Sequence, residues 1–470
     1  MKKIRKYTLT AAGLFVLYLV LSVVFVYIRQ PEVSREYQEA FDPGACYSDA
    51  GSCDRAYIIE DNSEALAERI RMIEQAEERI ILSTFEFRAD ESGKDVLAAL
   101  IHAAERGVEV KVLADGFPAL LQMKGNTYFQ ALSTMKQAEI KLYNQVNLLM
   151  PWKSMGRLHD KYVIVDDYLY LLGGRNTYDY FLGDNGYKNY DRDVLVYSME
   201  PENEESSIHQ LEAYFESVWE SSACRYFYDN PANASRTQII EAREELEERY
   251  LVLQERYELD KAPDYKQMTF AVNRITLLSN PIHVYAKEPT VFYALMQLMK
   301  DTEKESTIHT PYIICNDWMY EELTEICDGN QHVSLMTNSA ANNGNPFGAS
   351  DYTLNKGKLL DTGLTIYEYE GGVSYHGKSI TIGDELAIVG SFNMDMRSVY
   401  LDTELMLVIH SKEVAQQLRG YMETYEKESV KVIDKENCEI PAGVTRQEMG
   451  GAKKLKLYGV MLLNWLRFLM

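Results

Sequence analysis

The sequence predicts an α/β protein in which two related halves pack about a pseudo-twofold axis, with an active site between them and a membrane-spanning helix before them. Three observations lead to this prediction: an uncharged apolar segment near the N-terminus, an alternation of helical and β-rich segments, and a motif that occurs twice at matched spacing. With 470 residues, of which 46% are hydrophobic, the chain is long enough for two or three domain-sized cores.

The N-terminal segment predicts a membrane anchor. Residues 1–6 carry four basic side chains, and residues 7–28 carry no charge. A segment of this length can span the hydrocarbon core as a helix. A cleaved signal peptide is the alternative, but residues 26–29 do not resemble a small-residue cleavage site. Because the basic cluster comes first, the positive-inside rule places the rest of the chain outside the cytoplasm, although Arg29 and Arg35 lie on the far side.

A linker of residues 29–54 follows, and it contains the close cysteine pair Cys46 and Cys53. A disulfide between them is one interpretation if the loop lies outside the cytoplasm, and two unpaired thiols are the other. No Cys-x-x-Cys pair and no cluster of Cys and His occurs at metal-ligand spacing. The sequence therefore predicts neither a metal nor a cofactor.

Two segments with the same alternation of helices and strands follow the linker. In the first half, residues 55–230, the expected elements are helices at 63–78 and 93–106 and strands at 79–87 and 108–113. In the second half, residues 269–430, they are strands at 275–278, 306–310 and 333–337 and helices at 289–300 and 317–327. This alternation is typical of a sheet that is covered by helices.

The segments outside the two halves are charged. Residues 231–268 connect the halves, and within them residues 237–260 predict an amphipathic helix with a solvated charged side. The C-terminal tail, residues 431–470, ends in an apolar stretch at 457–470 that follows three lysines and is too short to span a membrane. An interfacial amphipathic helix and a helix packed on the protein body are both consistent with this pattern.

Both halves contain a His-x-Lys motif, and the offsets after it are the same. A Gly lies 14 residues after each His and an Asn lies 17 residues after it, without gaps. The shared residues are His159, Lys161, Gly173 and Asn176 in the first copy and His376, Lys378, Gly390 and Asn393 in the second. A single His-x-Lys would be a weak signal, whereas two copies with matched offsets are a strong one.

The residue types of this motif suit a phosphodiester. In each copy the apolar run after His-x-Lys predicts a strand, and a second strand returns the Asn to the His. Two imidazoles then face two ammonium groups and two amides. Lys and Asn can donate hydrogen bonds to non-bridging oxygens, one neutral imidazole can attack phosphorus, and the other can protonate the leaving alkoxide. This arrangement requires no metal.

The duplicated motif resembles the His-Lys-Asp motif of the phospholipase D superfamily, and the likeness covers residues 55–409. Within that superfamily the chain resembles the membrane-bound cardiolipin synthase branch of bacteria. The stretches that carry this second likeness are residues 173–176, 179–181, 337–341, 390–398 and 403–404. The resemblance implies that His159 is the nucleophile and that His376 acts first as general acid and then as general base.

The resemblance also implies that an acidic residue downstream of each Asn orients the histidine of its own half. By position these acids are Asp193 for His159 and Glu404 for His376. A carboxylate at the distal ring N–H fixes the tautomer and raises basicity. Ser391, between Gly390 and Asn393, is carried over as a further supporting residue.

The third residue of the motif differs between the copies. Asp166 has the family's Asp, whereas Gly383 occupies the equivalent position and Asp384 follows it. Because the later offsets are unchanged, this difference is a substitution. That Asp is thought to be mainly structural in the family, so we expect its loss to be tolerated, and a partly degenerate second half is the alternative.

The function that the resemblance implies is phosphatidyl transfer to make cardiolipin or a related phospholipid in a bacterial cell membrane. The chain would be a single-pass protein with its catalytic part outside the cytoplasm. Its partners would be the membrane and phospholipids: phosphatidylglycerol, with phosphatidylethanolamine or cardiolipin as further candidates. The net charge of −23 weighs against nucleic acid as a partner. The alternatives are a hydrolytic phospholipase D, a nuclease and an inactive lipid-binding scaffold.

Overall fold

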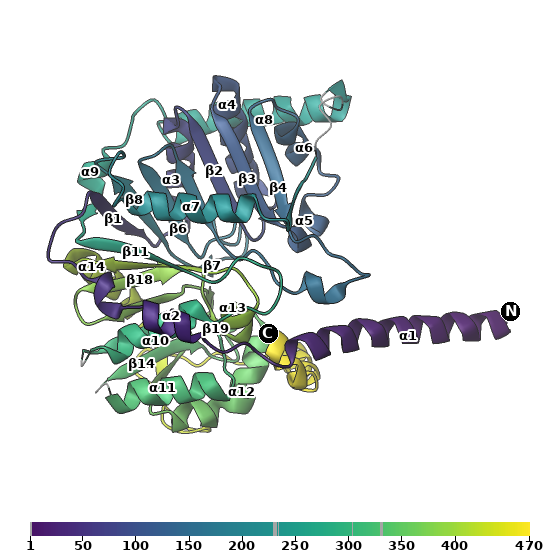
Figure 1. The fold of residues 1–470 in the computed structure, drawn as a ribbon, viewed down its shortest axis with the longest axis vertical. Helices are drawn as coiled ribbons and strands as arrows, with labels where there is room; N and C mark the ends of the chain where they lie inside the picture. The colour runs from purple at the N-terminus through teal and green to yellow at the C-terminus, as the bar shows by residue number, and fades with distance from the viewer. Residues whose placement is uncertain (1, 229–232, 234, 303, 330–331) are drawn as a thin grey trace.

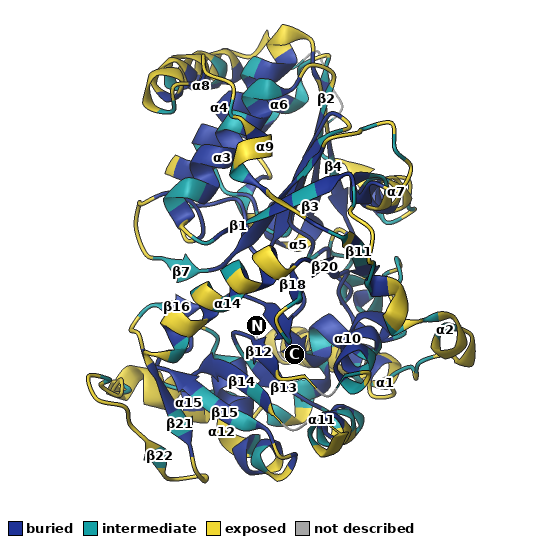
Figure 2. Ribbon diagram, turned by 90° about the vertical axis from the view of Figure 1, so that its left-hand side faces the viewer, coloured by how far each residue is buried: buried dark blue, intermediate teal, exposed yellow. Residues whose placement is uncertain are grey.

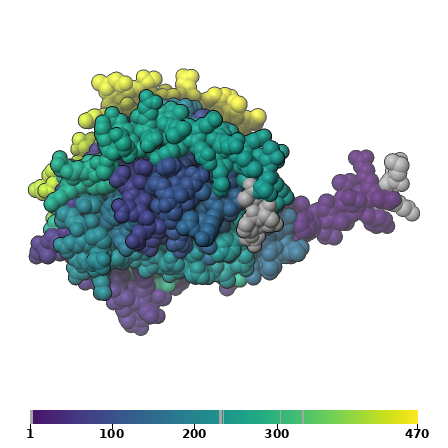
Figure 3. Space-filling model, turned by 90° about the horizontal axis from the view of Figure 1, so that it is seen from above, coloured from purple at the N-terminus to yellow at the C-terminus, as the bar shows by residue number. Residues whose placement is uncertain are grey.

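The computed structural model describes residues 2–228, 233, 235–302, 304–329 and 332–470. Two α/β halves lie one above the other (Figure 1). Helix α1 (Lys2–Tyr27) projects from the body as a single arm (Figures 1 and 3). The fold class predicted from the sequence is therefore confirmed. The predicted boundary between residues 230 and 231 falls outside the described residues.

The first half is built on a nine-stranded mixed sheet. In spatial order its strands are β10 (Phe270–Ala271), β1 (Asp54–Ile59), β8 (Asp193–Ser198), β6 (Leu169–Gly173), β5 (Tyr162–Val165), β2 (Arg79–Thr84), β3 (Glu109–Asp115), β4 (Ala138–Tyr143) and β9 (Cys224–Tyr226). The pairs β2–β3 and β3–β4 are parallel, and the other pairs are antiparallel. The antiparallel pair β5–β6 carries the first copy of the motif.

The second half repeats this topology. Its strands, in spatial order, are β11 (Arg274–Ser279), β20 (Leu405–His410), β18 (Leu386–Gly390), β17 (Ser379–Ile382), β12 (Ser306–His309), β14 (Val333–Asn338), β15 (Thr365–Tyr369), β21 (Ser429–Val432) and β22 (Cys438–Glu439). The parallel pairs are β12–β14 and β14–β15, and they follow the motif strands β18 and β17 as β2–β3 and β3–β4 follow β6 and β5 in the first sheet. Strands β17 and β18 thus correspond to β5 and β6.

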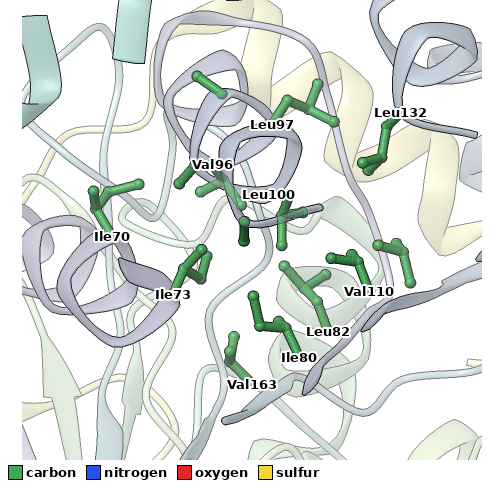
Figure 4. Close-up of a cluster of buried hydrophobic side chains, with 14 of the residues drawn as sticks. Ile70, Ile73, Ile80, Leu82, Val96, Leu97, Leu100, Val110, Leu132 and Val163 are labelled. Carbon is green, nitrogen blue, oxygen red and sulfur yellow. The ribbon is translucent and has the colours of Figure 1, made fainter. Parts of the chain in front are cut away.

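Helices cover the outer face of each sheet. The first half has α3 (Asn62–Gln75), α4 (Glu91–Arg106), α5 (Gly116–Gln122), α6 (Thr127–Ser133), α8 (Thr237–Arg256) and α9 (Tyr265–Met268). Helices α3 and α4 begin at the capping carboxylates of Asp61 and Asp90, and α4 ends at Gly107, whose φ of 101° favours glycine. Their apolar faces pack on β2, β3 and β5 (Figure 4). The second half has α10 (Thr290–Lys300), α11 (Asp317–Gly329), α12 (Pro346–Asp361) and α13 (Met396–Tyr400).

The inner faces of the two sheets share one apolar core. It includes Leu172 and Val194 from the first sheet and Val389 and Leu407 from the second. Helices α7 (Ser207–Trp219) and α14 (Lys412–Glu426) complete this core. Because both faces of each sheet are covered, the strands are buried along most of their length, as Figure 2 shows. The halves therefore pack as one body.

The expected elements agree with the structure except at some of their ends. The strand expected at 79–87 ends at Thr84. Residues 270–271, which we assigned to the second half, form β10 and pair with β1 of the first sheet. The predicted connecting helix is α8, and it packs on α4 and α6 instead of only linking the halves.

The linker is ordered and lies against the second half. It contains α2 (Arg35–Ala40) and the short helix η1 (Pro43–Cys46). Cys46 lies in the core of the second half, whereas Cys53 lies directly before β1. Both thiols are free, so of the two interpretations the structure has the unpaired one.

The C-terminal tail packs on the body and also keeps an exposed apolar side. It forms α15 (Gly451–Met461) and the short helix η4 (Asn464–Leu469). Leu457 and Phe468 are buried, and Arg467 forms an ion pair with Asp351 of α12. Leu462 stays exposed. The tail ends at the base of α1 (Figure 1).

Candidate active site

The two copies of the motif lie at the N-terminal ends of β5 and β17, where the two halves meet. Lys161 directly precedes β5, and Lys378 directly precedes β17. Both ammonium side chains are buried, and each donates a hydrogen bond to the backbone carbonyl of the histidine two residues before it. The motif is therefore held in an extended conformation that brings His and Lys of each copy together.

The backbone of each motif is held by the opposite half. The N–H of His159 donates to Thr403 Oγ1 at 3.1 Å, and Leu158 forms an isolated bridge with Thr403. In the other copy the N–H of His376 donates to the carbonyl of Tyr190 at 2.6 Å. The short strands β16 (Ser374–Tyr375) and β7 (Asn189–Tyr190) pair there in parallel. The two halves thus exchange contacts on both sides of the site.

The imidazoles are oriented across the interface. His159 Nδ1 lies 2.8 Å from Glu404 Oε1, and His376 Nδ1 lies 2.7 Å from Asp191 Oδ2. Both carboxylates are almost completely buried. Because each Nδ1 has a carboxylate partner, Nε2 is the ring atom of each histidine that can react.

Two predictions about the orienting acids are therefore wrong. Glu404 orients His159 of the other half, not His376. Asp193 orients no histidine: it forms ion pairs with Arg69 at 2.9 Å and Arg175 at 3.2 Å, and all three side chains are buried. Asp191, two residues earlier, takes the place predicted for Asp193.

Strand register explains the choice of acid. Gly173 of β6 pairs with Asp193 of β8, and the equivalent Gly390 of β18 pairs with Met406 of β20. The residue two positions before Asp193 is Asp191, and the residue two positions before Met406 is Glu404. Asp191 and Glu404 are thus the equivalent pair, although Asp193 and Glu404 both stand directly before an apolar run in the sequence.

The serine predicted as a supporting residue acts through Glu404. Ser391 donates to Glu404 Oε2 at 2.5 Å, and Ser398 donates to Oε1 at 2.6 Å. The first half has Gly174 in place of Ser391, and a Cβ there would lie 2.2 Å from Asp191 Oδ1. Asp191, the shorter acid, therefore lies against Gly174, whereas Glu404, the longer acid, accepts a hydrogen bond from the Ser391 hydroxyl.

The two predicted amides lie near the strand ends. Asn176 Oδ1 accepts the N–H of Glu86 at 3.3 Å, so its amide nitrogen is the end that can donate to a ligand. Asn393 Nδ2 donates to the hydroxyl of Tyr312 at 3.2 Å, and its buried Oδ1 has no partner among the described residues. A buried amide oxygen without a partner is uncommon and is often explained by a ligand or a water.

Burial sets the charge of the site before any ligand binds. Burial and the nearby Lys378 lower the pKa of His376 to about 4, and burial with Lys161 lowers the pKa of His159 well below its ordinary value. Burial also lowers the pKa of Lys161 to about 7. Both imidazoles are therefore neutral at pH 7, as a nitrogen nucleophile must be.

The two acids differ in charge. Burial raises the pKa of Glu404 to about 8. Burial acts on Asp191 in the same direction, but Lys378, whose ammonium lies 3.2 Å away, and His376 together hold the pKa of Asp191 well below its ordinary range. The orienting acid of His376 is thus ionised at pH 7, whereas the orienting acid of His159 is largely protonated.

Asp166 lies away from the imidazoles, at the far end of β5. Its carboxylate accepts the backbone N–H groups of Glu77, Glu78 and Arg79 at 2.8 to 2.9 Å. These bonds fix the turn between α3 and β2. Gly383 lies at the equivalent end of β17, so the substitution in the second copy removes no group that faces the histidines.

Sequence reasoning missed three residues of the site: Asp191, Thr403 and Tyr312. Asp191 belongs to the same short acidic segment as Asp193, and only the register of β6 with β8 distinguishes them. Among the described residues, no group of three or more His, Cys, Asp or Glu side chains is placed to hold a metal ion.

Comparison with known proteins gives one family and several related chains. Residues 69–219 and 295–425 match the family described as cardiolipin synthase, PLD-like domain. An uncharacterised Helicobacter pylori protein is 23% identical over 80% of this chain and 80% of its own. Cardiolipin synthase C of Escherichia coli is 24% identical over 79% of this chain and 84% of its own.

Two further relatives extend the comparison. A cardiolipin synthase of Staphylococcus aureus is 25% identical over 77% of this chain, and the match spans 65% of that relative. The crystal structure of phosphatidylserine synthase from Haemophilus influenzae covers 88% of this chain and 95% of its own, with a TM-score of 0.62 and 16% identity. This structural likeness concerns the fold.

Proposed function

Because the chain belongs to the family of cardiolipin synthase, PLD-like domains, we propose that it is a phosphatidyltransferase that makes cardiolipin or a related phospholipid. The observation that carries the proposal is the reciprocal pairing of the two histidines. His159 and His376 each present Nε2 while an acid of the opposite half holds Nδ1. Two imidazoles arranged in this way can divide one phosphodiester exchange into two steps.

In the first step, His159 Nε2 attacks the phosphorus of the donor phospholipid. A nitrogen–phosphorus bond forms, the bond from phosphorus to the headgroup oxygen breaks, and the proton on His376 Nε2 passes to that oxygen. Lys161 and Lys378 neutralise the charge on the non-bridging oxygens, and the amides of Asn176 and Asn393 donate hydrogen bonds to them. The product is a phosphatidyl-histidine.

In the second step, His376 accepts the proton of an incoming hydroxyl, and the resulting oxygen attacks phosphorus. The bond to His159 Nε2 breaks, and the neutral imidazole returns. With phosphatidylglycerol as both donor and acceptor, the products are cardiolipin and glycerol. Water in place of the alcohol would give phosphatidic acid.

The scheme needs a protonated His376, and the negative charge of the bound substrate favours that state. In the ligand-free site burial lowers the pKa of His376 to about 4, so the ring is neutral at pH 7. An anionic phosphodiester beside the ring favours the imidazolium and raises that pKa. Asp191, which is ionised, stabilises the same imidazolium from Nδ1. His376 is therefore better suited to be the acid than His159, whose partner Glu404 has a pKa of about 8.

The membrane is the natural location for this chemistry. Residues Ile4–Tyr27 form a helix that is long and apolar enough to cross a bilayer. Only 6% of its most apolar 18-residue stretch is buried in the body. Together with the cardiolipin synthase relatives, this helix indicates a membrane-anchored protein. We propose that the body lies outside the cytoplasm, because the basic cluster precedes the helix. Protease added to spheroplasts should then digest the body, and inside-out vesicles should protect it.

The lipid products decide between transfer and hydrolysis. The chain should be expressed in bacteria that lack cardiolipin, and the extracted lipids should be analysed by mass spectrometry. Wild-type chain should give cardiolipin, His159→Ala should give none, and His209→Ala on α7 should match wild type as a control. Phosphatidic acid without cardiolipin would replace transfer by hydrolysis, and no new lipid from a folded chain would contradict both.

A further inference from the structure

The loop between β4 and β5 projects from the body on the same side as α1 (Figure 1). Its outermost part, residues 147–150, is called the tip here. Leu148 and Leu149 in the tip are 60% and 78% exposed. Two adjacent leucines this exposed at the end of a loop have no packing role in the body, so their exposure needs another explanation.

The tip contacts α1 at a depth where the helix crosses the membrane. The Tyr18 hydroxyl donates to the carbonyl of Leu149 at 2.6 Å. Tyr18 lies nine residues before Tyr27 in the sequence, which places it about 14 Å along the helix axis from the body end of α1. The 24 residues of the apolar helix span about 36 Å, only about 6 Å more than a hydrocarbon core. Even if all the excess lay at the body end, Tyr18 would sit about 8 Å inside the hydrocarbon, and its hydroxyl holds Leu149 beside the helix.

Except at Leu148, the polar backbone groups of the tip have hydrogen-bond partners within the protein, which suits this depth. Asn147 Oδ1 accepts the N–H of Leu149 at 3.0 Å and the N–H of Met150 at 3.1 Å. The Leu149 carbonyl accepts the Tyr18 hydroxyl, and the N–H of Asn147 donates to Ser154 Oγ at 2.8 Å. In water such groups need no protein partner, whereas in lipid each unsatisfied group costs several kcal/mol.

One neighbouring surface is apolar as well. Helix α5 starts against the base of the loop, since a Cβ on Gly116 would lie 2.7 Å from Gln145 Cα, and it exposes Phe117 and Leu121. A cavity of about 770 Å³ lies beside the tip, and its lining mixes apolar side chains such as Leu148 and Ile282 with the basic side chains of Lys153 and Arg225. The exposed apolar surface therefore continues from the tip onto α5, and the cavity beside it is of mixed character.

We propose that the tip is a second membrane-inserting element, which enters the hydrocarbon of the bilayer beside α1. This inference rests on the proposed anchoring by α1 and goes beyond it. The anchor alone fixes the distance of the body from the bilayer but leaves the tilt of the body relative to the bilayer surface free. A second inserted element restrains that tilt and thereby sets which face of the body is turned to the membrane.

The base of the loop connects the tip to the nucleophile. Asn144 Nδ2 donates to the carbonyls of Lys153 at 2.7 Å and Gly156 at 2.6 Å, which closes the loop. Arg157 donates to the carbonyl of Asn144 at 2.6 Å and forms a buried ion pair with Asp115. His159 follows two residues later in the sequence. The position of the tip in the bilayer thus fixes the position of His159 relative to the lipid headgroups.

Photocrosslinking of the full chain tests this inference. p-Benzoylphenylalanine replaces Leu149 in one variant and Leu148 in a second, in vesicles of phosphatidylglycerol and phosphatidylcholine. Leu14 in α1 is the positive control, and Ile433 is an equally exposed apolar control on the second half. After irradiation, intact-mass analysis should show lipid adducts at positions 149, 148 and 14, several-fold above position 433.

The controls separate the failure of the inference from the failure of the anchor. Adducts at position 14 without adducts at 149 or 148 would overturn the insertion of the tip while the anchor stands. No adducts at any of these positions would overturn both. Equal adducts at 433 and 149 would also overturn the inference, because the tip would then contact lipid no more than an exposed residue of the body does.

Discussion

Asp166 in the first half and Gly383 in the second half occupy equivalent turns. Each turn joins the two antiparallel strands that follow the motif of its half. Both residues have a positive φ, 48° and 59°, and both donate their backbone N–H to a carbonyl at the start of the neighbouring strand. Only Asp166 adds a carboxylate that accepts three further N–H groups. This carboxylate supports a turn, so the two copies differ in local stability and not in reactive groups.

The acids that orient the imidazoles show a second difference. Asp191 approaches Gly174 and is ionised, whereas Glu404 accepts from Ser391 and Ser398 and has a pKa of about 8. The two halves thus contribute the same residue types to the site but hold their histidines in different electrostatic environments. The environment of His376 favours gain of a proton, and the environment of His159 favours the neutral imidazole.

The strongest test of this division removes each imidazole in turn. His159→Ala should abolish both turnover and the covalent intermediate, because no nucleophile remains. His376→Ala should lower the rate of transfer by roughly 10²–10⁴-fold, as expected for loss of a general acid and base. Turnover of labelled phosphatidylglycerol and mass analysis of the trapped chain measure both. An intermediate that persists in His159→Ala would reverse or remove the assigned roles.

The next largest effect distinguishes the two orienting acids, Asp191 and Glu404, from each other. Asp191→Asn should lower kcat by roughly 10²–10⁴-fold, because the amide no longer stabilises the imidazolium. Glu404→Gln should cost less, because Glu404 is largely protonated at pH 7. Rates measured at pH 7 compare the two variants. A larger loss in Glu404→Gln than in Asp191→Asn would contradict the assigned asymmetry.

Asp193→Asn is the matched control for the register of β8. It leaves the guanidinium groups of Arg69 and Arg175 without a charged partner, so it should lower the free energy of unfolding by about 3–5 kcal/mol. The folded fraction should keep its kcat. Thermal unfolding in detergent and kcat per folded chain separate these effects, and a large loss of kcat at full stability would restore the role first predicted for Asp193.

The pH dependence gives a smaller but more specific signal. Glu404 is protonated below a pH of about 8 and ionised above it, so its ability to accept the Nδ1–H of His159 increases as pH rises. kcat should therefore rise towards pH 8 in the wild type and should be flat over that range in Glu404→Gln. In the ligand-free site Lys161 loses its proton above a pH of about 7, so binding of the anionic substrate should weaken and KM should rise over the same range. In the complex the phosphodiester raises the pKa of Lys161, so Lys161 keeps its charge in the step that kcat measures. An unchanged rise of kcat in Glu404→Gln would assign it to another group.

The smallest effect on catalysis is expected at the turn itself. Asp166→Gly removes an acceptor of three backbone N–H groups and should lower the free energy of unfolding by about 1–3 kcal/mol. Gly383→Asp should change kcat little, although its Cβ would lie 2.6 Å from Lys304 Cδ, so this lysine side chain must shift. Denaturation curves and lipid turnover measure the two. A loss of activity in Asp166→Gly larger than its loss of folded protein would give that residue a catalytic role.

The sequence predicted the duplication and both motifs because equal spacing is visible along one chain. It could not predict that Glu404 serves His159, since the origin of each acid depends on how the two sheets pack and on contacts such as His159 with Thr403. It also favoured Asp193 over Asp191, because both lie near the start of one strand and only pairing with β6 distinguishes them. Burial of the base of α1 in the second half is likewise a property of the packed structure.

The exchange of acids between the halves has an evolutionary consequence. A single half with this geometry would hold a histidine and an acid that do not belong to the same catalytic pair, so it would be inactive by itself. Two identical copies would complete each other as a symmetric dimer, and both pairs would then have to be alike. Joining the copies in one chain removes that constraint. Mutation could then change Gly383, Ser391 and Glu404 on one side without changing Asp166, Gly174 and Asp191 on the other.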